Sequence, residues 1–72
     1  MKFYIEFCEK WNYHPEFDRV STLIKIKYPH ASVIGNKNIP RSGSFEVLLE
    51  NKLLFSKFKE NRFPRKDEIS QW

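Results

Sequence analysis

The strongest fold signal in this chain is a strand pattern followed, after one short loop, by a helix pattern. In residues 2–7 (KFYIEF) apolar and more polar side chains alternate, which predicts a strand with one buried face. From Pro15 the apolar residues recur at helical spacing, and Pro29 predicts that this helix ends near Tyr28. This order is typical of an α/β fold and places the loop at the carboxyl end of the strand.

The rest of the chain carries further β patterns and one terminal helix pattern. We expect a strand at 31–34, a polar loop at 36–43, a hairpin with strands at 45–50 and 53–58, and a short helix from about residue 66 to the end. Asn51 suits the positive φ of the hairpin turn. Because so short a final helix is not stable alone, Ile69 and Trp72 must anchor it.

These elements combine into one small domain over residues 1–72. The order β-α-β-β-β-α predicts an α/β fold with a mixed sheet of about four to five segments. We expect both helices to cover one face of this sheet, because alternating strands leave the other face comparatively open.

Composition limits the classes of function. A single cysteine excludes an internal disulfide and favours a reducing compartment, and no apolar run approaches the roughly 20 residues of a membrane span. We therefore expect a soluble, cytoplasmic protein without a membrane partner. The net charge is +4, but the basic residues are dispersed and do not favour a nucleic-acid partner. One cysteine and two distant histidines, His14 and His30, predict no metal site.

The candidate site is the loop between the first strand and the first helix, with residues Cys8, Glu9, Lys10, Trp11, Asn12, Tyr13 and His14. Cys8 is either a reactive thiolate, favoured by the helix start and by Lys10, or a small apolar plug at the strand end. His14 is either a base or cation beside the thiol or a solvated turn residue, and we favour the second. Trp11 and Tyr13 form either a platform for a protein partner or ordinary packing.

Three stretches resemble the selenoprotein W, T and H family of thioredoxin-like (Rdx-type) proteins, and most closely selenoprotein W. They are residues 7–13 (FCEKWNY), residues 42–47 (SGSFEV), and residues 53–57 (LLFSK) followed by Phe63 and Pro64. In the family the first stretch reads aromatic, Cys, two variable positions, Sec or Cys, Gly, aromatic. The resemblance implies a thioredoxin-like fold with a CxxU- or CxxC-type redox motif that begins at Cys8.

Two positions depart from the family pattern. Asn12 replaces a glycine, which is a mild change because Asn tolerates the left-handed conformation. Trp11 occupies the second redox position, where an indole cannot resolve a mixed disulfide. Certain genetic codes read the selenocysteine codon as tryptophan, so Trp11 is either a native tryptophan or a translated selenocysteine codon.

The resemblance implies glutathione-linked, antioxidant thiol chemistry through Cys8, limited by Trp11 to a monothiol mechanism. Glutathione or another cellular thiol would be the partner, with no bound cofactor. The alternative is a non-catalytic module of the same fold that binds a regulatory protein through Trp11 and Tyr13.

Overall fold

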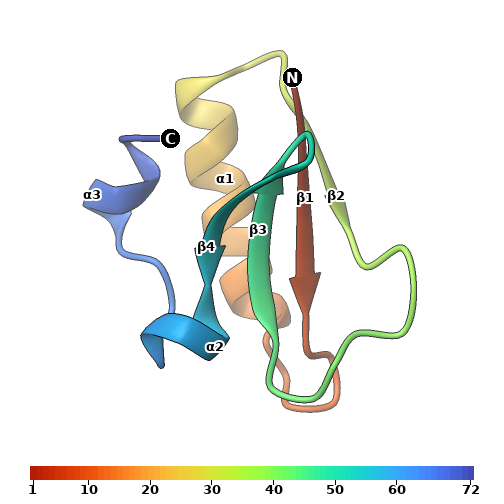
Figure 1. Ribbon diagram of the computed structural model, residues 1–72. Coiled ribbons are helices and arrows are strands. Elements are labelled where there is room, and N and C mark those ends of the chain that lie inside the picture. Colours follow the sequence, from red (N-terminus) through yellow and green to blue (C-terminus); the bar gives the residue numbers. More distant parts are fainter.

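The computed structural model describes residues 1–72 as four strands and three helices (Figure 1). In chain order these are β1 (Lys2–Phe7), α1 (His14–Lys27), β2 (Ser32–Gly35), β3 (Phe45–Leu49), β4 (Lys52–Ser56), α2 (Lys57–Glu60) and α3 (Lys66–Ile69). Pro15 lies in the first turn of α1, where its missing N–H costs nothing, and Glu16 lies near the positive amino end.

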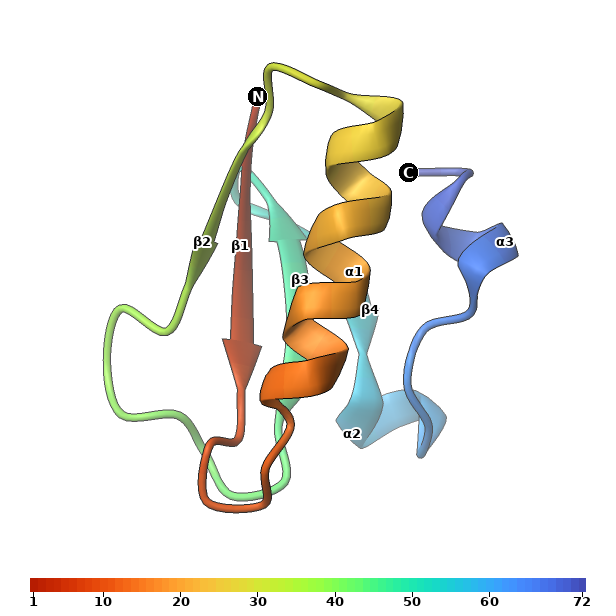
Figure 2. The same ribbon diagram turned by 180° about the vertical axis from the view of Figure 1, so that it is seen from behind.

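The strands form one mixed sheet in the order β2-β1-β3-β4. β1 pairs in parallel with β2 and antiparallel with β3, which pairs antiparallel with β4. α1 connects the two parallel strands, and it lies in front of the sheet when the molecule is turned (Figure 2). β1 is therefore a central strand, and its carboxyl end lies beside the carboxyl end of β2.

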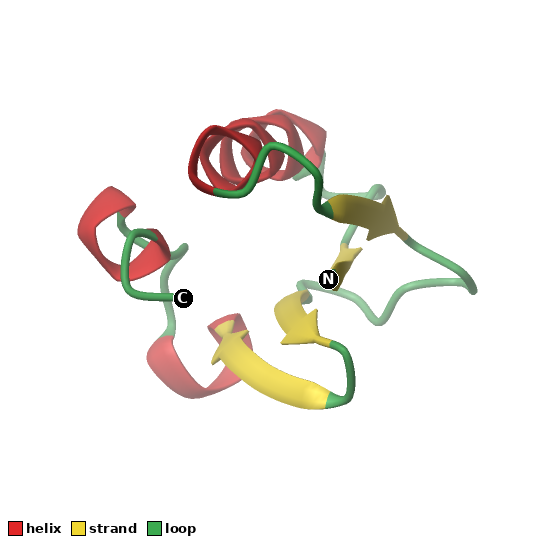
Figure 3. Cartoon of the chain, turned by 90° about the horizontal axis from the view of Figure 1, so that it is seen from above, coloured by secondary structure: helices red, strands yellow, loops and turns green.

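The hydrophobic core lies between the sheet and two of the helices. The inward-facing side chains of β1 are at most 4% exposed and form one cluster with Val20 and Ile24 of α1. Ile69 of α3 belongs to the same cluster and Trp72 packs against it, which confirms both predicted anchors of the terminal segment. Figure 3 shows α1 and α3 on the same side of the curved sheet, as expected.

The end of the hairpin differs from the prediction. β4 ends at Ser56 rather than residue 58, because residues 57–60 coil into α2, a helix that the sequence pattern did not predict. The Glu46 carboxylate accepts a hydrogen bond from the Lys57 N–H (2.9 Å) and so takes the place of a strand partner. Asn61 then closes the turn in the left-handed conformation (φ 58°).

Smaller corrections concern single residues. The positive φ of the hairpin turn (55°) falls on Glu50, and Asn51 is not in this region. A turn with positive φ only at its first central residue is of the II′ kind, which matches the twist of the strands. β2 begins one residue later than predicted, at Ser32, and α3 ends at Ile69 rather than at the last residue.

Candidate thiol site

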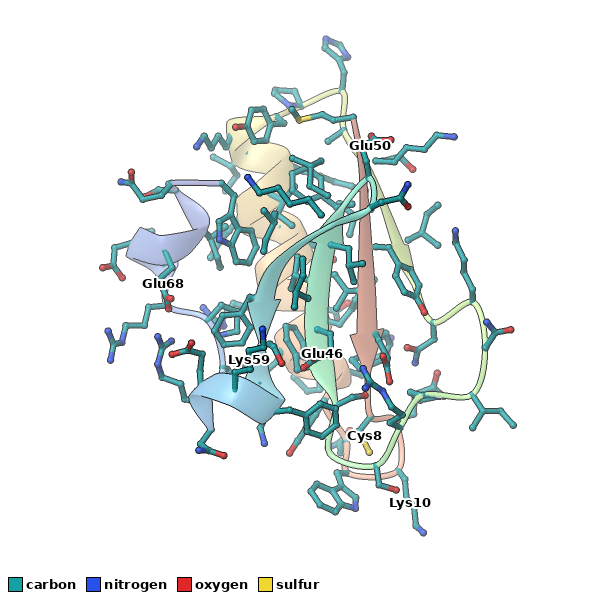
Figure 4. All side chains as sticks on the ribbon, in the orientation of Figure 1. Cys8, Lys10, Glu46, Glu50, Lys59 and Glu68 are labelled. Atoms are coloured by element: carbon teal, nitrogen blue, oxygen red, sulfur yellow. The ribbon has the colours of Figure 1, made fainter.

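Cys8 follows directly after β1, at the carboxyl end of a central strand. Its N–H donates a hydrogen bond to the Ser44 carbonyl (2.9 Å), and its own carbonyl accepts one from the Tyr13 N–H (3.1 Å). These bonds fix its backbone between β3 and the start of α1. Figure 4 shows Cys8 below the end of β1, with Lys10 directed away from the molecule.

A cavity of about 650 Å³ lies beside the thiol. Cys8, Glu9 and Lys10 line one side of it, and the loop after β2 lines the other with residues 36–40 and Ser42. Cys8 itself is only 2% exposed. It is therefore less accessible than we expected of a loop cysteine, and its burial agrees with the interpretation of Cys8 as an apolar plug. The loop after β2 passes this end of the sheet, and a ligand would approach Cys8 from the cavity between them.

The 36–43 loop, here called the strap, is held at both ends. Near its start, the Asn36 side chain accepts a hydrogen bond from the Phe7 N–H (2.9 Å) and donates one to the Phe7 carbonyl (2.9 Å), so it imitates a strand partner. Near its end, the Arg41 guanidinium donates to both Glu6 carboxylate oxygens (3.0 and 2.8 Å), and the Arg41 N–H donates to one of them (2.8 Å).

Sequence reasoning treated the strap as a plain polar loop and missed Glu6, Asn36 and Arg41. One signal was present. Because β1 and β2 are parallel, the chain that leaves β2 starts beside the end of β1 and must cross that end to reach β3. A loop after β2 is therefore constrained to pass the thiol.

The charges at the site are mixed. The hydrogen bonds from the Arg41 guanidinium hold the pKa of the Glu6 carboxyl below its ordinary value of 4.5. Glu6 is therefore ionised at neutral pH beneath the strap. Lys10, Lys37 and Glu9 are the charged residues that line the cavity. The Lys37 ammonium lies 5.4 Å from the centroid of the Tyr4 ring, so the two lysines give the rim of the cavity a net positive charge.

The two aromatic residues of the predicted site belong to the loop between β1 and α1 (residues 8–13), here called the thiol loop. Trp11 is 56% exposed, and its six-membered ring covers Gly43, where an added Cβ would lie 2.8 Å from the indole Cζ3. Tyr13 is half-buried and packs edge-on against Phe63, with 4.8 Å between ring centroids. Tyr13 is therefore largely packing, whereas Trp11 presents an aromatic surface beside the strap.

The remaining predicted residues have backbone or solvent roles. Asn12 adopts the left-handed conformation (φ 61°), as we expected of an asparagine at the position where the family has a glycine. His14 is exposed, lies 3.3 Å through Nδ1 from the Asp18 carboxylate, and does not line the cavity. This placement favours the solvated interpretation of His14. Of the seven predicted residues, Cys8, Glu9 and Lys10 share the cavity.

A family model described as the Rdx family matches residues 2–72, nearly the whole chain. The chain belongs to the Rdx family. This confirms the resemblance seen in the sequence around Cys8, and it agrees with the order of strands and helices in the sheet.

Solved structures share the fold of this Rdx chain. A selenoprotein W-related protein from Vibrio cholerae is similar with a TM-score of 0.83 at 15% identity, over 97% of this chain and 88% of that one. A protein from Bordetella parapertussis is similar with a TM-score of 0.83 at 14% identity, over 97% and 89% of the two chains. No curated protein sequence matches. These likenesses show a thioredoxin-like fold.

No group of three or more His, Cys, Asp or Glu side chains in the Rdx chain is arranged to hold a metal ion. None of its helices has the length and mean hydropathy needed to cross a bilayer.

Proposed function

We propose that this Rdx protein carries out thiol–disulfide exchange through Cys8 by a monothiol mechanism. The observation that carries the proposal is the position of Cys8 in the wall of the 650 Å³ cavity. Cys8 directly follows the end of β1, where the motif that resembles the family's begins. Ligand sites in sheets of this class gather at the carboxyl ends of the strands.

The chemistry is a pair of exchanges. The Cys8 thiolate attacks one sulfur of a small disulfide, a bond forms between Sγ and that sulfur, and the other half leaves as a thiolate. Since Cys8 is the only cysteine, no internal thiol can resolve the mixed disulfide. A second external thiol attacks the substrate-derived sulfur, Cys8 leaves as a thiolate, and the external pair is oxidised to a disulfide.

Glutathione is the proposed partner. Its carboxylates are complementary to Lys10 and Lys37, and Asn38 lines the same cavity. The cavity volume falls within the roughly 300–1,000 Å³ of small-molecule sites. A cytoplasmic, antioxidant role would follow from such exchange, because the cytosol supplies glutathione in its reduced form.

The test is to incubate the purified protein with oxidised glutathione and to measure its mass. We expect one glutathione on the wild type, none on Cys8→Ser, and loss of the adduct when reduced glutathione is added in excess. A wild-type protein that stays unmodified while free cysteine in a separate, matched solution of oxidised glutathione reacts would reject the proposal.

The exposed face of Trp11 favours a second candidate, a binding module that holds a regulatory protein. Aromatic side chains are enriched among the residues that contribute most to interfaces, and Trp11 is 56% exposed. Here we expect Trp11→Ala to weaken capture of the partner on immobilised protein, while Cys8→Ser leaves it unchanged. The opposite pattern would point back to the thiol.

A further inference from the structure

We propose that Glu6 and Arg41 determine the specificity of the thiol site: they hold the strap across Cys8, so that small disulfides reach the sulfur and disulfides of folded proteins do not. This inference rests on the proposed exchange at Cys8. Neither residue touches the reacting sulfur, and both act by positioning the strap.

The Glu6–Arg41 anchor fixes the main chain of the strap. The carboxylate accepts three hydrogen bonds from Arg41, one of them from the backbone N–H, at 2.8 to 3.0 Å. The Glu6 side chain is only 16% exposed, and the Arg41 guanidinium also lies 4.9 Å from the centroid of the Phe58 ring. The Arg41 side chain is 64% exposed, but a bidentate, charge-assisted pair is stronger than a hydrogen bond between neutral groups.

The Asn36 anchor closes the other end. Its side chain bonds to both backbone groups of Phe7 and also donates to the Glu9 carboxylate (3.0 Å). It therefore ties the strap to β1 and to the thiol loop together. Phe7 directly precedes Cys8, so this anchor lies next to the thiol.

Between the anchors, residues 37–39 of the strap make few contacts. The Lys37 N–H donates a long hydrogen bond to the Tyr4 hydroxyl (3.4 Å), and Ile39 is 96% exposed, so it adds almost no buried apolar contact. The position of this segment beside the cavity therefore depends mainly on its two ends. If the Arg41 end is released, the segment gains freedom and Cys8 becomes open to larger molecules.

Access matters because disulfide exchange requires an approach to the sulfur itself. Cys8 is 2% exposed, so both the disulfide that Cys8 attacks and the thiol that later releases it must enter the cavity. A tripeptide disulfide can present one sulfur through such an opening. A disulfide on a folded protein brings a surface that collides with the strap before the sulfurs meet.

The experiment compares two maleimides of different size on the folded protein. N-ethylmaleimide is the small probe, and a maleimide coupled to fluorescein is the large and rigid one. Glu6→Gln removes the anionic acceptor but keeps its shape, and Arg41→Gln removes the donor from the strap side. Glu68→Gln is the matched control, because it breaks an arginine–carboxylate pair remote from the cavity.

For Glu6→Gln and Arg41→Gln we expect the ratio of large-probe to small-probe rate to rise about tenfold, as fits the loss of charge-assisted hydrogen bonds. Glu68→Gln should keep the wild-type ratio. Circular dichroism and urea titration identify a variant that has unfolded, and the other Glu6 or Arg41 variant then decides. An unchanged ratio in a folded variant, or an equal rise in Glu68→Gln, overturns the inference.

The two proposals fail in different ways. If oxidised glutathione does not modify Cys8 but the probe ratio rises in the two variants, the exchange chemistry is wrong and the strap still controls access. If glutathione modifies Cys8 and the ratio does not change, the exchange stands and the strap has no role in specificity.

Discussion

At the scale of single residues, the contact between Trp11 and Gly43 shows how the fold accommodates the indole ring. Gly43 has φ +76°, a conformation that side chains rarely adopt, and the indole ring covers the place where a Cβ would stand. Two independent reasons thus require glycine there. Trp11 is accommodated by the end of the strap, and in this form it serves as a packing surface rather than as a nucleophile.

This contact predicts the effect of Gly43→Ala. We expect a loss of about 1–2 kcal/mol in the free energy of unfolding from the left-handed backbone alone, and a further loss from displacement of the indole. Urea denaturation measures the total. In a Trp11→Ala background the second contribution should disappear and the first should remain. Equal costs in the two backgrounds would show that the indole does not press on Gly43.

At the scale of elements, the short helix α3 depends on the contacts of one carboxylate, that of Glu68. α3 has four residues, too few to be stable alone. Glu68 accepts hydrogen bonds from the Arg62 guanidinium and from the Arg65 N–H at the helix start (2.9 Å). The Arg62 contact, followed by the backbone bond, lowers the pKa of Glu68 from 4.5 to about 2.

The sign of this pKa shift predicts how α3 responds to acid. A carboxyl whose pKa is lower in the folded state stabilises the fold at pH values above 4.5, and this contribution disappears as the pH falls from 4.5 towards about 2. We expect Glu68→Gln to lower the Tm by a few degrees at neutral pH, since the pair is partly exposed.

The comparison of the wild type with Glu68→Gln in acid tests whether the charge of Glu68 causes this difference in Tm. Thermal unfolding followed at several pH values should show the Tm of the wild type approaching that of Glu68→Gln as Glu68 becomes protonated. A Tm difference that persists undiminished near pH 2 would mean that Glu68 stabilises α3 without its charge. No Tm difference at any pH would mean that packing of Ile69 and Trp72 holds the helix.

At the scale of the whole molecule, the two faces of the sheet have different environments. Val47 of β3 lies on the helix-covered face and is fully buried. On the other face an apolar row crosses all four strands, because Tyr4 pairs with Ile34 on one side and with Leu48 on the other, and Leu48 pairs with Leu53. Ile34 is 38% and Leu53 43% exposed, so this row is in contact with water.

The asymmetry predicts opposite outcomes for the same substitution on adjacent strands. Val47→Lys should leave the chain largely unfolded, because it places an unpaired ammonium in a small core. Leu53→Lys should change the free energy of unfolding by no more than about 0.5 kcal/mol, since the lysine stem still covers the sheet and its charge reaches water. Urea titration separates the two, and a large loss in Leu53→Lys would contradict an open face.

The sequence by itself determined the features that depend on local periodicity and on the backbone preferences of single residues. Alternation defined β1, the prolines marked the limits of α1, and the left-handed conformation of Asn12 follows from its side chain. The order of these elements, with Cys8 after the first strand, was sufficient to suggest the family that the chain proved to match.

Tertiary structure alone decided how accessible the thiol is. Glu6 and Arg41 lie 35 positions apart, and Asn36 lies 29 positions from Phe7. No local pattern encodes such pairs. They form because parallel pairing of β1 with β2 brings the end of β2 beside Cys8, and the strap then passes the loop that carries the thiol. A second contact that local periodicity does not encode, the Lys57 N–H bonded to the Glu46 carboxylate of β3, lies where β4 ends and α2 begins.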